Sequence, residues 1–375
     1  MQQHAVSRSR RRWPFVALAL LVPLLAAGWT AAWYYAAGRA GAVIEGWRER
    51  EARSGRIHRC ASESIGGFPF RFELRCLEPT LEVKTADRQL HVAAKDILLS
   101  AELWQPTRFA GEIVGPLTVS EPGQSATIVA NWRRASVEMR GLPVAPERGT
   151  IAIDNPVFER TDGAETRRLF TAQRLETVGR MLEGSARHNP VIEVSVLLTE
   201  AVAPDLHAIA EKPFDADITA VLRGLRDFRP KPLPERFREI QASGGSIEIK
   251  QAKVRQAETV ARANGTLGLT ARGRLDGQLR VAVANLAALL PALGLSKRAD
   301  QPAPIDKAAE RLDRVAPGLG NVARQNAGPA LLAGLNFIGQ PVEIEGQRAL
   351  ALPLRFSDGV VSLGPIPLGQ VAPLF

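Results

Sequence analysis

Cysteine and aromatic residues are scarce in this chain. Among 375 residues only Cys60 and Cys76 are cysteines, and aromatic residues make up 6%. A metal site needs more ligands than this pair and the nearby His58 provide. If the chain lies outside the cytoplasm, the two cysteines are a natural disulfide pair. Closing a loop of that size stabilises a fold by about 3 kcal/mol. Two unrelated buried thiols are the alternative.

The short motifs of common catalytic sites are also missing. The sequence has no G-x-S-x-G, H-E-x-x-H, C-x-x-C or P-loop pattern. Its five histidines are too widely spaced to form an i, i+4 pair on one helix face. Glycines in residues 318–323 resemble a dinucleotide-binding fingerprint, but the residues before them favour a helix where that site requires a strand. We therefore expect no catalytic, cofactor-binding or metal-binding residue. An enzyme whose site gathers distant residues is the least favoured alternative.

Concentrated positive charge is absent beyond the first dozen residues. The net charge is +9, and Arg8, Arg10, Arg11 and Arg12 contribute four of these charges with no acid beside them. The other basic residues are dispersed among acidic ones. Because nucleic-acid binding needs a basic face, often with aromatic stacking platforms, we expect no nucleic-acid partner.

An uncharged apolar run over residues 13–37 is the clearest feature that the sequence does contain. At about 1.5 Å per residue, a helix of this length crosses a hydrocarbon layer of about 30 Å. Two tryptophans and two tyrosines gather in residues 29–35, and such rings favour the level of the lipid headgroups. The basic residues 1–12 are expected to stay in the cytoplasm, which places the rest of the chain on the outer side. A cleaved signal peptide is the alternative.

The first strands after residue 56 are predicted to pair as a hairpin. Its two arms, residues 57–62 and 68–76, each contain a cysteine and are separated by a Gly-Gly turn. Phe68, Phe70 and Phe72 occupy alternate positions in the second arm, with polar or turn residues between them. That is the period of a strand with one buried face. We expect these three side chains to begin the buried face of the sheet.

Further strand candidates follow at short intervals, separated by Pro, Gly, Asn and Asp. In the first part of the chain they lie at residues 80–84, 90–99, 109–119, 126–130, 136–140, 149–153, 191–199 and 216–222. Residues 167–182 fit either a helix or a long polar strand. The expected divisions are a basic tail (1–12), a transmembrane helix (13–37), a membrane-proximal helix (38–56), a first β-rich half (57–228) and a second β-rich half (229–375).

The second half repeats strands and tight turns. Asn264-Gly265 and Asp276-Gly277 are strong hairpin dipeptides, and Asp358-Gly359 is a third. Apolar residues at helical spacing predict a helical insertion over about residues 285–337. In the strand after it, one apolar face, structural or ligand-facing, is formed by Leu350, Leu352, Leu354 and Phe356.

Three features together resemble a known family: the single N-terminal anchor, the stretch GGFPFRFELRC with a cysteine before it, and a C-terminal hairpin pattern ending in LGPIPLG. They resemble an alphaproteobacterial group of envelope proteins catalogued as a domain of unknown function, over about residues 57–375. The resemblance implies a bacterial inner-membrane protein with a cytoplasmic N-terminus and a periplasmic body, and no assigned activity. The C-terminal pattern also resembles AsmA-like envelope proteins, whose long bent β-sheets with an apolar concave face are associated with lipid movement or outer-membrane upkeep.

These observations predict a mainly β (α+β) fold, in which a transmembrane helix is followed by an elongated, curved antiparallel sheet of serial hairpins with packed or capping helices. The working hypothesis for function is non-enzymatic. An apolar groove holds or passes a lipid or another hydrophobic envelope component, and the N-terminal helix provides the membrane contact. The alternative is a scaffold with an ordinary packed core that binds other envelope proteins.

Overall fold

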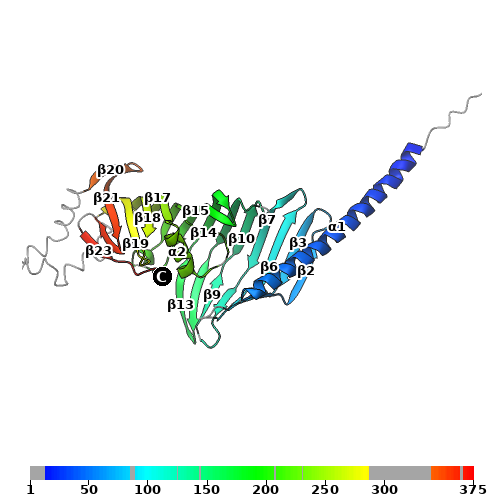
Figure 1. The fold of residues 1–375 in the computed structure, drawn as a ribbon, viewed down its shortest axis with the longest axis horizontal. Helices are drawn as coiled ribbons and strands as arrows, with labels where there is room; N and C mark the ends of the chain where they lie inside the picture. Colours follow the sequence, from blue (N-terminus) through cyan, green and yellow to red (C-terminus); the bar gives the residue numbers. More distant parts are fainter. Residues whose placement is uncertain are drawn as a thin grey trace, which may run out of the picture.

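The apolar run and the predicted membrane-proximal helix form one continuous helix, α1 (Trp13–Arg53), in the computed structural model (Figure 1). This helix is long and apolar enough to cross a membrane. The structure describes residues 13–84, 89–124, 126–142, 145–206, 208–229, 231–286, 339–363 and 366–375. Apart from residues 285–286, the expected helical insertion at 285–337 lies outside the described residues.

The described strands form two antiparallel sheets of seven and sixteen strands, which confirms the predicted mainly β fold. The smaller sheet contains, in spatial order, β1 (Arg56–Arg59), β4 (Thr80–Lys84), β5 (Gln89–Ala93), β8 (Leu117–Ser120), β9 (Ala126–Asn131), β12 (Val157–Asp162) and β13 (Glu165–Thr171). The larger sheet contains β2 (Ser62–Gly66), β3 (Arg71–Leu77), β6 (Asp96–Glu102), β7 (Gln105–Val114), β10 (Arg134–Arg140), β11 (Arg148–Asp154), β14 (Arg174–Ser185), β15 (His188–Ala201), β16 (Phe214–Leu222), β17 (Ser246–Gln256), β18 (Thr259–Leu269), β19 (Leu275–Ala284), β21 (Gln347–Ser357), β22 (Val360–Leu363) and β23 (Ile366–Gln370), with β20 (Gln340–Ile344) paired to β21.

Strands of one sheet continue into strands of the other after breaks of two residues, such as Glu78-Pro79 between β3 and β4 and Asn155-Pro156 between β11 and β12. Hydrogen bonds carry the ladder through these breaks. The Glu78 amide donates to the Lys95 carbonyl oxygen at 3.0 Å, and the Asn155 amide donates to the Gln173 carbonyl oxygen at 2.9 Å. The two sheets are therefore two wings of one sheet that is folded along a crease.

Proline occupies the breaks at which the chain passes from the larger sheet into the smaller one. Pro79, Pro116 and Pro156 each lie in a break, at intervals of 37 and 40 residues. Because proline has no amide hydrogen, it is tolerated where a ladder bends and not inside a central strand. The crease thus has a sequence period of about 40 residues, which lies in the range typical of structural repeats.

The first hairpin differs from the sequence prediction. β1 pairs with β4 in the smaller sheet, and the partner of β3 is β2 in the larger sheet. The reason is that the first arm breaks at Cys60-Ala61, on the crease, so that its two parts belong to different wings. The arms that pair are residues 62–66 and 71–77.

Two of the three expected buried phenylalanines lie outside the strand. β3 begins at Arg71, and residues 67–70 form the turn, which the Arg71 amide closes by donating to the Gly67 carbonyl oxygen at 3.1 Å. Phe68 and Phe70 are therefore exposed turn residues and do not begin the buried face. Pro69 between them has no amide hydrogen with which to extend the ladder, although the alternation of apolar residues runs on through it.

Two dipeptides expected at hairpin turns lie inside strands. Asn264-Gly265 is in the middle of β18, and Asp276-Gly277 is near the start of β19. A side chain on Gly265 would clash with the Gln278 carbonyl oxygen of the neighbouring strand, so glycine here permits close approach of two backbones. Asp358-Gly359 does form the expected turn, with both residues at positive φ. The ambiguous segment 167–182 is strand, divided between β13 and β14.

The larger sheet continues across the proline-rich connection near residue 229. β16 pairs directly with β17, although a long connection containing α2 (Leu233–Ala242) separates them in sequence. A short 3₁₀ helix (Ala208–Glu211) precedes β16. Figure 1 shows the elongated, curved result, with α1 extending beyond the β2 end of the sheet and β23 near the opposite end.

Candidate functional site

One face of the larger sheet is apolar along nearly its whole width. Residues directly opposite each other on neighbouring strands point to the same face, so the register arranges them in rows across the sheet. One row contains a single polar member, Thr177, and consists of Ile65, Leu74, Leu99, Gly111, Val137, Ile151, Thr177, Val196, Ile218, Ala252, Ala263, Val281 and Leu352. A parallel row on this face is wholly apolar and consists of Phe72, Ala101, Phe109, Met139, Gly149, Gly179, Val194, Ala220, Ile249, Gly265, Leu279, Leu354 and Leu363.

The opposite face of the same sheet is largely polar. On this face, the row beside the Ile65–Leu352 row, on the side away from the second apolar row, includes Arg75, Glu112, Ser136, Glu176, Asp217, Lys253 and Arg262. Ion pairs such as Arg174–Glu176 and Arg134–Glu112 form among the charged side chains of these strands. The sheet is therefore amphipathic, and we call its apolar side the inner face.

Helix α1 lies against the apolar sides of both wings. Its Trp33 stacks on Phe72 of the inner face, with ring centroids 5.4 Å apart. Its Trp47 lies against His58 of the smaller sheet, at 4.7 Å. His58 begins a row that continues through Leu81, Val92, Val119 and Ile128 and ends at Arg160 and Arg167. The two apolar faces thus line one trough, which consists of the inner face and this row, with α1 at one end.

The middle of this trough is open. Ile151 of β11 belongs to the inner face, yet it is 45% exposed. Gly149 and Gly179 lie directly opposite each other on β11 and β14. A Cβ atom added to either glycine would meet no heavy atom within 4 Å. A sheet packed against a core would cover these positions, so this part of the inner face is an open apolar surface.

The trough is covered at both ends. At the α1 end, a cavity of about 420 Å³ lies between the helix and the sheet, and its wall includes Val43, Ile44, Phe72, Leu99, Leu103 and Phe109. Further along, Ile240 of α2 packs where Ile247 and Leu267 lie opposite each other.

At the far end, β21 is buried on both sides. Leu350 and Leu352 pack with Leu286 and Leu363 on the inner face, while Ala349 packs with Val260, Ala284 and Ile344 on the other.

Five of the predicted apolar residues share the inner face. Leu354 lies in the same row as Phe72, at the opposite end of the sheet, and Leu352 lies in the adjacent row. Leu350 lies two residues before Leu352 on β21, and Phe356 lies two residues after Leu354, so both point to the same face. The structure does not bring Phe68 and Phe70 to this face. Sequence reasoning missed the middle of the trough, where small residues such as Gly149 and Gly179 give no alternating apolar signal.

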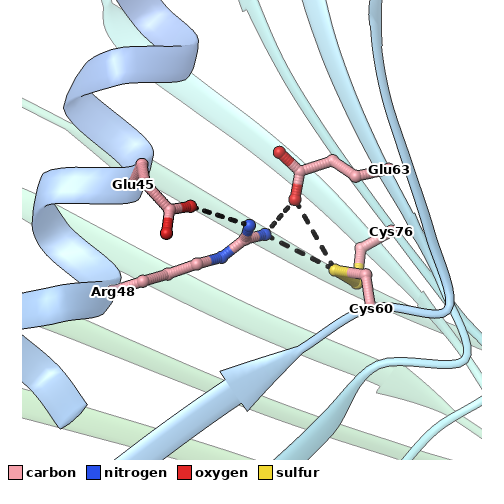
Figure 2. Close-up of a disulfide and its surroundings, with 5 residues drawn as sticks. All are labelled: Glu45, Arg48, Cys60, Glu63 and Cys76. Atoms are coloured by element: carbon pink, nitrogen blue, oxygen red, sulfur yellow. Dashed lines mark hydrogen bonds and ion pairs between the residues drawn. A yellow bond between two sulfur atoms is a disulfide. The ribbon is translucent and has the colours of Figure 1, made fainter.

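The two cysteines lie beside the contact between α1 and the sheet. Cys60 is at the crease and Cys76 is on β3; their Cα atoms are 5.4 Å apart and their sulfur atoms are at disulfide distance. Glu63, opposite Cys76, is the charged member of its inner-face row, and it forms an ion pair with Arg48 of α1 (Figure 2). Arg48 also lies 3.5 Å from the Cys60 sulfur and 3.6 Å from Glu45. This cluster joins α1 to the first strands.

A second charged cluster holds α2 in place. Glu239 is buried, forms ion pairs with Lys231 and Arg236, and accepts a hydrogen bond from the Arg226 amide at 2.6 Å. Burial alone raises the pKa of Glu239, but this hydrogen bond and the two cations more than offset it and lower the pKa to about 2. Glu239 therefore carries its charge at every physiological pH.

The described residues show no metal-binding constellation. Among them, no group of three or more His, Cys, Asp or Glu side chains is placed to hold a metal ion. Burial lowers the pKa of His58, which favours the neutral form of the ring against Trp47. The arrangement that the structure does build is an amphipathic sheet whose apolar inner face begins at an apolar helix.

Comparison with known proteins gives a family and no activity. No curated protein matches the chain. The more distant likeness to AsmA-like proteins stays a prediction. A family match, in contrast, covers residues 33–372, from the end of the apolar run to the last strands. The chain therefore belongs to the bacterial family described as "Uncharacterized protein conserved in bacteria (DUF2125)".

Proposed function

We propose that this protein is anchored in the bacterial inner membrane by α1 and holds or passes a lipid, or another hydrophobic envelope component, in its trough. The observation that carries the proposal is the open stretch of the inner face around Gly149, Ile151 and Gly179. The basic residues 1–12 keep the N-terminus in the cytoplasm, and the sheet lies in the periplasm.

The energetics favour an apolar occupant. A soluble protein rarely leaves a continuous apolar surface facing water unless that surface has a partner. Each methylene group that moves from water into such a groove gains about 0.8 kcal/mol. An acyl chain lying along the inner face would satisfy this surface without needing any specific polar contact, which agrees with the apolar rows and their single threonine.

The length of the trough favours movement as well as storage. Thirteen strands contribute to the row from Ile65 to Leu352. At about 4.8 Å between neighbouring strands, the row extends over about 60 Å, which is twice the thickness of a hydrocarbon layer. A lipid that enters beside α1 therefore has an apolar path leading away from the membrane.

The scaffold alternative needs an ordinary packed core and a surface for other envelope proteins. The buried end around Leu350 and Leu352 fits such a core, but the open middle does not. An enzyme of unknown type is favoured by no observation among the described residues.

Photolabelling of the full chain tests the proposal. The protein is placed in vesicles that contain a phospholipid with a diazirine on its acyl chain, irradiated, and digested for mass spectrometry. Labels on α1 are expected from anchoring alone. Labels on β11 and β14, around Ile151, are expected only if a lipid occupies the trough, and labels confined to α1 would contradict the proposal.

Two variants form a matched pair for this experiment. Ile151→Lys places a charge on the inner face, where the native side chain is 45% exposed. Leu197→Lys places the same charge on the polar face, where Leu197 lies between Glu176 and Asp217 and is 42% exposed. We expect the first variant to lose the label on β11 and β14, and the second to keep it.

A further inference from the structure

We propose that Phe68, Phe70 and Trp104 form a second membrane contact, which docks the α1 end of the trough on the surface of the bilayer that α1 crosses. We call these three residues the aromatic tip. The proposal rests on the proposed anchoring by α1, and it does not depend on whether the trough holds a lipid.

The aromatic tip combines two adjacent hairpin turns. Phe68 and Phe70 lie in the turn between β2 and β3, and Trp104 lies in the turn between β6 and β7. The Leu103 amide donates to the Phe70 carbonyl oxygen at 3.0 Å, and the rings of Phe70 and Trp104 are 5.8 Å apart. All three side chains are nonetheless exposed, at 47%, 55% and 62% in chain order.

Contacts with α1 fix the position of the aromatic tip along the direction in which α1 crosses the bilayer. The indole nitrogen of Trp29 donates to the Pro69 carbonyl oxygen at 3.0 Å, and that of Trp33 donates to the Arg71 carbonyl oxygen at 3.2 Å. Counted from Trp13, about 20 helical residues cross a hydrocarbon layer of about 30 Å, which places the far boundary near Trp33. The turn of residues 67–70 is therefore held at the level where the bilayer ends.

The chemistry of the tip fits the lipid interface. Residues 67–70 carry no charge, and aromatic rings are enriched at the level of the headgroups, where one side is apolar and the other is wet. The Phe68 ring packs against Trp33 and Tyr34 of α1, with ring centroids 5.6 Å and 6.2 Å away. The parts of the three rings that stay exposed are apolar area that a bilayer surface would cover. Because the tip is fixed beside the spanning helix, the bilayer is the partner that it meets first.

The tip also explains how a hydrocarbon chain reaches the trough. The cavity between α1 and the sheet includes Phe72, just after the first turn, and Leu103 and Pro106, in and after the second. With the tip at the lipid interface, this cavity opens beside the outer leaflet. A lipid tail then enters sideways from the bilayer without crossing water.

Site-specific crosslinking of the full chain tests the aromatic tip. The photoreactive residue p-benzoylphenylalanine replaces Phe70 or Trp104, and the protein is reconstituted in vesicles of phosphatidylethanolamine and phosphatidylglycerol. Both substitutions keep an aromatic ring at an exposed position, so the fold is retained. The control is the same replacement at Leu206, which is 77% exposed on the loop after β15.

We expect lipid adducts at positions 70 and 104 and none at position 206. The absence of lipid adducts at 70 and 104, or equal lipid adducts at all three positions, would overturn the proposal. The outcome is separable from that of the trough. Lipid adducts at the tip with no acyl-chain label on β11 and β14 would sustain the membrane contact and refute the proposed function. The reverse result would refute the membrane contact alone.

Discussion

Gly149 and Gly179 face each other across β11 and β14, and a Cβ atom built on either would have no heavy atom within 4 Å apart from those of the glycine itself and its two chain neighbours. Glycine inside a strand destabilises it by about 0.5–1 kcal/mol relative to alanine, because the unfolded chain is freer. Two adjacent glycines on the inner face therefore keep a hollow open in the trough at the expense of strand stability.

Filling this hollow with larger side chains should abolish lipid binding in the trough without lowering the stability of the fold. We expect Gly149→Val together with Gly179→Val to leave the midpoint of urea unfolding unchanged or higher, because valine favours strands and meets no clash. The same double variant should lose the photolabel on β11 and β14. Thr150→Val, on the polar face of β11, is the control. A double variant that unfolds more easily would show that the hollow is not open space.

The contact between α1 and the sheet depends on Arg48. Removing it by Arg48→Met leaves the Glu63 carboxylate without its cation on an apolar face, and we expect a loss of about 1–3 kcal/mol in the free energy of unfolding. Glu63→Leu in the same chain removes the stranded charge and should recover most of that loss. A double-mutant cycle measured by denaturant unfolding checks this. Additive effects would indicate that the two residues do not interact.

The disulfide should stabilise the first strands measurably. Replacing Cys60 and Cys76 with alanine removes a constraint across a separation of 16 residues, which is worth about 3 kcal/mol in the unfolded chain. Urea unfolding of the variant and of the oxidised protein gives the difference. A thiol assay on protein that was isolated without reductant and then unfolded should find no free thiol; two reactive thiols would refute the pair.

The crease places Asn155 in the left-handed region of the backbone, at φ 51°, just before Pro156. Asparagine tolerates this conformation, whereas a β-branched residue does not. We expect Asn155→Val to lower the free energy of unfolding by about 1–2 kcal/mol. Asn155→Gly, which accepts positive φ freely, should change it little. Equal losses in the two variants would point to the asparagine side chain and away from the backbone.

Acid should weaken the attachment of α2. The pKa of Glu239 is about 2 in the folded protein and near 4.5 when the chain is unfolded, so its contribution to stability is complete above pH 4.5 and is lost as the pH falls towards 2. Glu239→Gln removes that dependence. We expect the unfolding free energies of the two proteins to differ by about 1.5–3 kcal/mol at pH 7, where the charged hydrogen bonds are intact. This difference should shrink between pH 4.5 and pH 2, and a constant difference would argue against the ion pairs as its source.

Several elements follow from the sequence because their signals are local. The apolar run gives a helix long enough to cross a membrane, and β21 shows its inner face through alternating Leu350, Leu352, Leu354 and Phe356. Short strands separated by turn residues give an antiparallel sheet. The Asp358-Gly359 turn is equally local, because both residues accept positive φ. In each case the structure depends only on residues that are close together in the sequence.

Which strands pair with each other, and which part of the apolar face is open, could be learned only from the tertiary structure. Pairing of β2 with β3, and of β1 with β4, depends on the break at Cys60-Ala61, and register is set by contacts between strands and not within them. Asn264-Gly265 shows the same limit, since a strong turn signal yields to a neighbouring backbone that requires glycine.

The apolar helix and the amphipathic strands can be predicted from the order of the residues alone. The crease, and the exposure of Leu99 and Ile151 on the apolar face, cannot, because solvent exposure depends on what packs across a sheet. Alternation of residues along one strand carries no information about that.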